Sequence, residues 1–167
     1  MKVYDQGIEI VHANTIYTDF RSGNQIPLKF LKLCSFSQAE DMQALDLAQI
    51  RHEHAFGMAA VGTHSTRGGF LKDVLAYAGI TGFNEVDGNK LAVVGGVITI
   101  PQARGIGLAH QTLTSLIEVA SAEAAVTEHE HSGFMATSNP QAEGLFKDLG
   151  FVPAGQSGDK QMFVKNN

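Results

Sequence analysis

The feature that most constrains the fold is an apolar run that leads through a glycine-rich turn into a helix. Residues 91–100 read LAVVGGVITI, which is too short to cross a membrane and is typical of a buried strand. Pro101 ends the run, Gly105 and Gly107 follow, and apolar residues recur at helical spacing from Ala109 onward. A helix that begins directly after a glycine turn presents unpaired backbone N–H groups at the positive end of its dipole. The stretch therefore predicts an anion site, most often for phosphate.

The composition bounds the class of protein. With 167 residues, of which 44% are hydrophobic and 17% charged, the chain is long and apolar enough to form a globular domain. Twelve Lys and Arg against 17 Asp and Glu give a net charge of −5, and no basic cluster is interleaved with aromatic residues, so we expect no nucleic-acid partner. Asp5 and Glu9 interrupt the N-terminus, which argues against a signal peptide, and no apolar run is long enough to span a membrane. Together with a single cysteine, Cys34, this predicts a cytoplasmic protein without a membrane partner.

Hydrophobic periodicity and turn residues predict the order of elements. Residues 1–28 are expected to form an N-terminal extension packed on the domain, with a strand near residues 8–11, and residues 29–167 to form one domain. The further elements we expect are a strand at 30–36 that buries Cys34, a helix from Ser37 to about His52 or His54, antiparallel strands at 58–62 and 74–83, the central strand at 91–100, a long helix from Ala109, a strand at 134–136, a helix with Asn139 as N-cap, Pro140 at its first position and Gly150 at its end, and a closing hairpin at 151–154 and 161–165.

The glycine turn does not match the common nucleotide-binding motifs. A Walker A loop requires Lys and Ser or Thr after its last glycine, where this chain has Leu108 and Ala109. A dinucleotide-binding fingerprint requires a third glycine and an acidic residue at the end of the next strand, and neither is in place.

Two motifs do resemble one family, the GNAT N-acetyltransferases, over roughly residues 30–165. The family signature Gln/Arg-x-x-Gly-x-Gly/Ala is met twice in nested registers, by Gln102, Gly105 and Gly107 and by Arg104, Gly107 and Ala109. Residues 139–151, NPQAEGLFKDLGF, are similar to the family segment Asn-x-x-Ala-x-x-Leu-Tyr-x-x-x-Gly-Phe. The two motifs stand in the family's order, so together they are far more specific than either alone.

The resemblance implies a mixed α/β (α+β) fold, a central mostly antiparallel sheet flanked by helices in the order β-α-β-β-β-α-β-α-β-β. It implies acetyl-CoA as co-substrate, without a metal, in a cleft between the central strand and the strand at residues 134–136, together with an amine acceptor. The residues implied to bind acetyl-CoA are Ile98, Thr99, Ile100, Gln102, Ala103, Arg104, Gly105, Ile106, Gly107, Leu108, Ala109, Asn139 and Phe146.

The groups that commonly transfer protons in this family are missing from their usual positions. Phe146 stands where the family often has a tyrosine that protonates the leaving thiolate, and residues 91–100 contain no carboxylate that could act as the base. The candidate replacements are His64, expected in a loop after the first hairpin strand, and Ser138. His64 has the alternative of an exposed loop histidine. The HEH triplets at residues 52–54 and 129–131 lack the spacing of a helical zinc site and are interpreted as solvated helix ends.

The leading hypothesis is an N-acetyltransferase that moves an acetyl group from acetyl-CoA to a primary amine of a small molecule or peptide by direct attack in a ternary complex. Two alternatives stay open: a non-catalytic acyl-CoA-binding or sensing module on the same fold, and a phosphate or nucleotide binder. In this fold the acceptor site is expected at residues 52–57 and 154–160, which do not identify the amine. A homodimer through the C-terminal strands is compatible with the fold.

Overall fold

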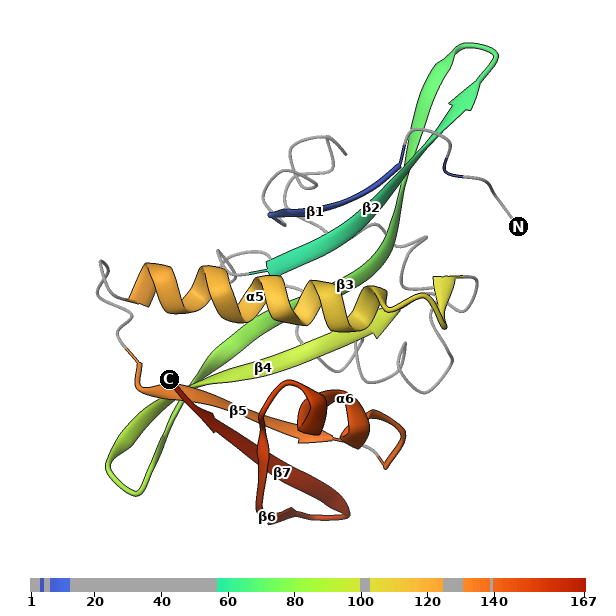
Figure 1. Cartoon of the computed structure of the whole chain (residues 1–167). Helices are drawn as coiled ribbons and strands as arrows, with labels where there is room; N and C mark the ends of the chain where they lie inside the picture. The colour runs from blue at the N-terminus through green and yellow to red at the C-terminus, as the bar shows by residue number, and fades with distance from the viewer. Residues whose placement is uncertain (1–3, 5–6, 13–56, 100–102, 125–130, 139) are drawn as a thin grey trace.

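The computed structural model describes residues 4, 7–12, 57–99, 103–124, 131–138 and 140–167. Within these ranges seven strands form one sheet in the order β1-β2-β3-β4-β5-β7-β6 (Figure 1). The elements in chain order are β1 (Ile8–His12), β2 (Gly57–Thr66), β3 (Gly69–Val86), β4 (Asn89–Thr99), α5 (Leu108–Ala124), β5 (Gly133–Ser138), the 3₁₀ turn η2 (Pro140–Ala142), α6 (Glu143–Asp148), β6 (Val152–Ser157) and β7 (Lys160–Asn166).

The sheet is antiparallel except where β4 and β5 pair in parallel. The parallel pair is joined by the crossover helix α5, as parallel neighbours require. The mixed, mostly antiparallel sheet confirms the fold class expected from the sequence. The strand expected near residues 8–11, the central hairpin and the closing hairpin are confirmed, with longer strands. The expected strand at 30–36, the helix from Ser37 and the environment of Cys34 lie outside the described residues.

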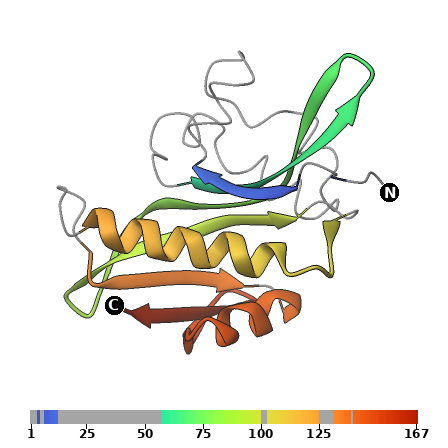
Figure 2. The same ribbon diagram turned by 45° about the horizontal axis from the view of Figure 1, so that its top comes forward.

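Both described helices cover the same face of the sheet, which we call the helix face (Figure 2). Leu113, Leu116 and Ala120 recur at helical spacing along α5 and are almost fully buried. They pack in one core with strand residues that alternate along each strand, such as Ala78 and Ile80 of β3. No helix within the described ranges is long and apolar enough to span a membrane.

The helix α6 begins later than the sequence predicts. Pro140 was expected at the first position of an α-helix, but it opens the 3₁₀ turn η2, and α6 starts at Glu143. The fixed φ of proline suits either helix type, so the residue alone does not distinguish them. The end of α6 is as expected: Gly150 has a φ of +88°, its N–H donates to the carbonyl of Lys147, and Phe151 N–H donates to the carbonyl of Phe146. This Schellman arrangement returns Phe151 to the core.

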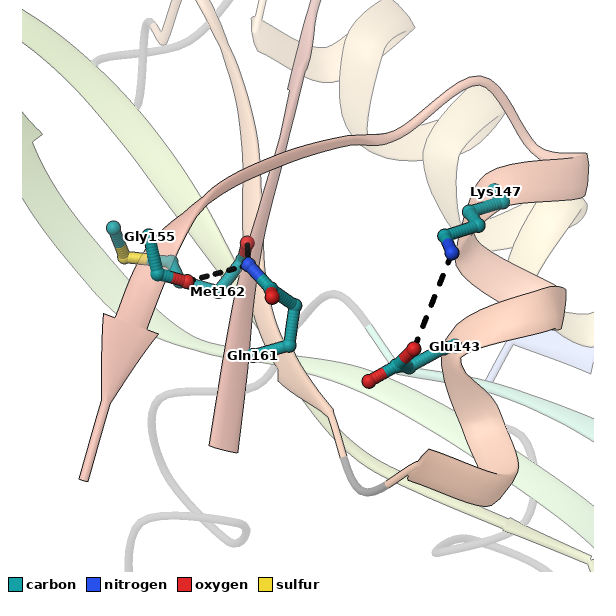
Figure 3. Close-up of polar contacts among 5 residues, drawn as sticks. All are labelled: Glu143, Lys147, Gly155, Gln161 and Met162. Carbon is teal, nitrogen blue, oxygen red and sulfur yellow. Dashed lines mark hydrogen bonds and ion pairs between the residues drawn. The ribbon is translucent and has the colours of Figure 1, made fainter. Parts of the chain in front are cut away.

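The closing hairpin of β6 and β7 contains a bulge between Pro153 and Gln156. Gln161 Nε2 donates to the carbonyl oxygens of Gly155, at 2.5 Å, and Met162, at 3.0 Å (Figure 3). Because a bulge takes backbone groups out of the ladder, the Gln161 amide supplies a partner for the Gly155 carbonyl. Figure 3 also shows the ion pair between Lys147 and Glu143 of α6, with 4.0 Å between Nζ and Oε2.

Candidate functional site

The central feature of the site is the separation of β4 from β5. The two strands pair in parallel over three residue pairs, from Leu91 with Gly133 to Val93 with Met135. Beyond this point β4 continues to Thr99 and β5 to Ser138 without pairing to each other. Backbone N–H and C=O groups on the facing edges of these two segments therefore lack strand partners across the split, which suits an extended ligand that pairs as a strand does.

The glycine loop, which we define as residues 103–108, lies between the end of β4 and the start of α5. Gly105 has a φ of +84° and Gly107 of +80°, a conformation that favours glycine. A Cβ atom added at either position would meet nothing within 4 Å, and both glycines are exposed. The loop thus combines a left-handed backbone with open space on its surface. Both features allow a ligand to approach the backbone closely.

The start of α5 directs backbone donors toward this open space. Gly107 caps the helix, because its carbonyl accepts the first intrahelical bond, from Gln111 N–H at 3.0 Å. The N–H groups of Leu108, Ala109 and His110, which come before Gln111 in α5, have no acceptor inside the helix. The first turn of α5 contains no acidic residue that could neutralise the positive end of the dipole. This geometry supports the phosphate site predicted from the sequence.

The two ends of the glycine loop are fixed while its middle is exposed. Ala103 and Leu108 are 6% and 4% exposed, and Arg104 Nε donates to the Thr99 carbonyl oxygen at 3.2 Å. Thr99 Oγ1 is buried and finds no hydrogen-bond partner within the described part of the chain. A buried hydroxyl without a partner is costly, by about 1–3 kcal/mol, so a ligand that reached Thr99 at the end of β4 would remove this cost.

The remaining predicted acetyl-CoA residues fall in different places. Ile98 lies on β4 with its backbone paired to Tyr77 of β3, while Ile106 is 58% exposed and Ala109 lies in the first turn of α5. Ile100, Gln102 and Asn139 lie outside the described residues.

Phe146 is a core residue. It is 3% exposed, its ring stacks on Phe163 with centroids 5.8 Å apart, and it meets Phe151 edge-on at 5.2 Å. An aromatic cluster on α6, β7 and the chain after α6 accounts for its burial without a ligand.

The two candidate catalytic residues lie apart. The prediction that His64 lies in a loop is wrong, because β2 continues to Thr66 and His64 pairs with Leu71 inside the hairpin. Since Thr99, the last residue of β4, pairs with Ala76, His64 lies beyond the end of β4 and one strand further away. The His64 ring instead meets Tyr4 edge-on at 5.9 Å. Ser138 ends β5 at the split, 3% exposed.

The described part of the histidine triplets adds no metal site. No group of three His, Cys, Asp or Glu residues that could hold a metal is found within the described ranges. His131 is buried beside Phe83 and Phe134, and its Nδ1 lies 3.1 Å from the Gly133 carbonyl oxygen. The interpretation of this triplet as a solvated helix end is therefore wrong for His131, which packs against the start of β5.

One residue near the split was missed from the sequence. Tyr77 of β3 is 4% exposed, and its hydroxyl lies over Gly79, which pairs with Gly95 of β4. The signal in the sequence was a tyrosine two residues before a glycine on a buried strand, which places both residues on one face.

Comparisons with known proteins agree with this fold. Solved structures with the same fold include AtaTR bound with AcCoA (TM-score 0.67, 13% identity, 96% of this chain and 94% of that chain covered). They also include AtaT complexed with acetyl-methionyl-tRNAfMet (0.63, 15%, 96% and 95%) and the NatC complex bound to Gag peptide and CoA (0.60, 14%, 94% and 95%). The curated proteins contain no match to this sequence. The model of the acetyltransferase (GNAT) family matches residues 27–151, so the chain belongs to this family and is an acyltransferase.

Proposed function

We propose that the chain is an N-acetyltransferase that moves the acetyl group of acetyl-CoA to a primary amine of a small molecule or peptide by direct attack in a ternary complex. The observation that carries the proposal is the separation of β4 from β5 directly beside the glycine loop. Acetyl-CoA has a diphosphate and an extended arm with amide groups. The start of α5 offers N–H donors to the diphosphate. The edges of β4 and β5 that do not pair with each other offer backbone partners to the arm.

The residues present fit this co-substrate. The open space at Gly105 and Gly107 leaves room for a diphosphate against the backbone, and Arg104 and Thr99 join the loop to the strand that would hold the arm. In the proposal, Ile98 and Ile100 pair with the arm through their main chains, and Gln102 and Asn139 also contact the co-substrate. When bound, acetyl-CoA supplies the thioester that the amine attacks.

The chain's own contribution is orientation and electrostatics. N–H groups on the free edge of β4 can donate to an oxygen that gains negative charge during attack, which is a common way of lowering the barrier to acyl transfer. The amine must also reach the site neutral, and the leaving thiolate must receive a proton. Phe146 can supply neither step, since its ring has no exchangeable proton and is packed in the core.

The acceptor in the proposal is a primary amine, and solved structures with the same fold hold different molecules. AtaT is seen with acetyl-methionyl-tRNAfMet and NatC with a Gag peptide, which differ in size and charge. The proposal therefore includes acceptors that are carried on a nucleic acid. The acceptors to compare are polyamines, free amino acids, peptides with a free N-terminus and aminoacyl-tRNA.

The test has two parts. Calorimetry measures whether acetyl-CoA and CoA bind, with ATP as the control ligand, and a thiol reagent then measures CoA release with each acceptor. We expect binding of both CoA species and amine-dependent release. Binding without release from any acceptor would contradict transfer and favour a sensing module, for which Phe146 in place of the family tyrosine is the specific argument. Binding of ATP alone would contradict both.

A further inference from the structure

The phenol of Tyr77 lies flat along β3, on the face opposite to the helix face. Its hydroxyl oxygen is 2.5 Å from the position that a Cβ at Gly79 would take, and its Cζ is 3.1 Å from that position. Tyr77 and Gly79 therefore project to one face, while Ala78 between them packs in the core with α5. The Tyr77 phenol can occupy this position only because residue 79 is a glycine, since a Cβ there would collide with the hydroxyl.

This position lies beside the point where the sheet divides. Gly79 pairs with Gly95 of β4, only two residues beyond Val93, the last residue of β4 that pairs with β5. Paired residues of antiparallel strands lie about 4.5–5.5 Å apart between Cα atoms. Gly95 and Gly96 carry no side chain, so no β4 side chain stands between the phenol and the split at these positions.

The direction from which an acceptor arrives is also restricted. In the described part of the chain both helices, α5 and α6, cover the helix face of the sheet. In the proposal, the amine that attacks a thioester held between β4 and β5 arrives from the opposite face, which is the face of Tyr77. Neither β4 from Leu91 to Thr99 nor β5 carries an ionisable side chain, so these strands supply no acid or base of their own.

We propose that Tyr77 is the proton-transfer residue of the acyl transfer, an inference that rests on the proposed function. The amine nitrogen forms a bond to the thioester carbon, and the carbon–sulfur bond then breaks. The phenol O–H, directly or through one water, gives its proton to the leaving sulfur to form the CoA thiol. The phenolate takes a proton from the new amide nitrogen, so the phenol is restored and one proton has moved from nitrogen to sulfur.

The first test does not require the acceptor to be known. The chain has three tyrosines, Tyr4, Tyr17 and Tyr77, so tyrosine labelled with ¹³C at Cζ gives signals that the three Phe variants assign. On saturation with acetyl-CoA we expect the Tyr77 signal to shift and the Tyr4 signal to stay. The Gly107 amide signal reports binding. A shifted Gly107 with an unshifted Tyr77 would overturn the inference and leave the proposed function standing, whereas an unshifted Gly107 would overturn the proposed function itself.

The second test measures turnover with an acceptor that the wild-type chain uses. Tyr77→Phe should lower kcat by about 10²-fold or more, as removal of a general acid does, and leave the acetyl-CoA Kd within about twofold. Gly79→Ala keeps the phenol but forces it aside, so it should lose turnover as well. Tyr4→Phe is the matched control, because the Tyr4 ring also lies over a strand glycine, Gly62 of β2, which is one strand further from the split than β3. Tyr77→Phe at the wild-type kcat, with thermal unfolding unchanged, would overturn the inference.

Discussion

Arg104 Nε donates a hydrogen bond to the carbonyl oxygen of Thr99, 3.2 Å away, and so ties the glycine loop to the end of β4. The bond joins the part of the chain that offers donors to a diphosphate to the strand that offers its edge to the arm. A guanidinium can hold this carbonyl and still have further N–H groups for other acceptors, since it carries five donors in a fixed plane. Loss of this one side chain should therefore affect affinity more than stability.

We expect Arg104→Ala and Arg104→Lys both to weaken acetyl-CoA binding by about fivefold, which corresponds to about 1 kcal/mol, the usual net contribution of one hydrogen bond. Lysine keeps the charge but lacks the planar fork that places Nε against the Thr99 carbonyl. Calorimetry checks the affinity. Arg67→Ala, at the exposed turn between β2 and β3, is the control for loss of one positive charge. A Lys variant that binds as tightly as wild type would show that charge alone matters at this position.

Gly107→Ala should reduce both stability and affinity, whereas Gly88→Ala should reduce stability alone. The two glycines have nearly the same φ, +80° and +79°, and neither Cβ would meet an atom within 4 Å, so the backbone cost of about 1–2 kcal/mol is matched. Only Gly107 lies where a ligand would approach. We expect its acetyl-CoA Kd to rise about tenfold or more, measured by calorimetry beside urea unfolding. Equal affinities in the two variants would contradict a ligand at the glycine loop.

Phe146→Tyr should destabilise the protein and leave turnover no higher than in wild type. The ring is 3% exposed between Phe151 and Phe163, and a hydroxyl buried there without a partner costs about 1–3 kcal/mol. Urea unfolding measures the cost, and Phe83→Tyr, on a half-buried ring, serves as control. If Phe146→Tyr instead raised kcat, its ring would have to reach the thioester.

Two glycines should respond in opposite directions to alanine. At Gly133 a Cβ would collide with the Lys165 carbonyl oxygen of β7. Gly133→Ala should therefore destabilise the protein by about 4 kcal/mol, which is typical of strongly disruptive core changes. At Gly144, inside α6, a Cβ would meet nothing within 4 Å, and Gly144→Ala should stabilise it by about 0.5–1 kcal/mol. Thermal unfolding of both variants checks the signs.

Local patterns predicted most of the described elements, because they need only nearest-neighbour information. The apolar run of β4, the glycine turn and the spacing along α5 each specify an element without reference to the rest of the chain. The start of α6 was misplaced because Pro140 fits a 3₁₀ turn as well as an α-helix. His64 was misplaced because its polar neighbours resemble a loop, although a hairpin partner keeps them extended.

The site was predictable only where the backbone makes it. The roles of Gly105 and Gly107 could be predicted from the sequence because their backbone conformation favours glycine. The role of Tyr77 could not be predicted, because its position beside the split depends on the pairing of Gly79 with Gly95. That register is fixed by strand pairing between residues distant in the sequence. Phe146 stands at the tyrosine position of a family motif, yet whether its ring faces a ligand or a core is decided by Phe163, which lies on β7.

The three residue pairs between β4 and β5 also connect the two halves of the sheet. In the described part of the chain, the strands β1 to β4 and the strands β5 to β7 form two antiparallel blocks, and strand pairing joins the blocks at those three pairs. A ligand that bonds to the facing edges of β4 and β5 would add backbone contacts between the same two blocks. Its affinity and the mechanical coupling of the two blocks would then arise from the same hydrogen bonds, so the co-substrate would act as a strand of the sheet as well as a reactant.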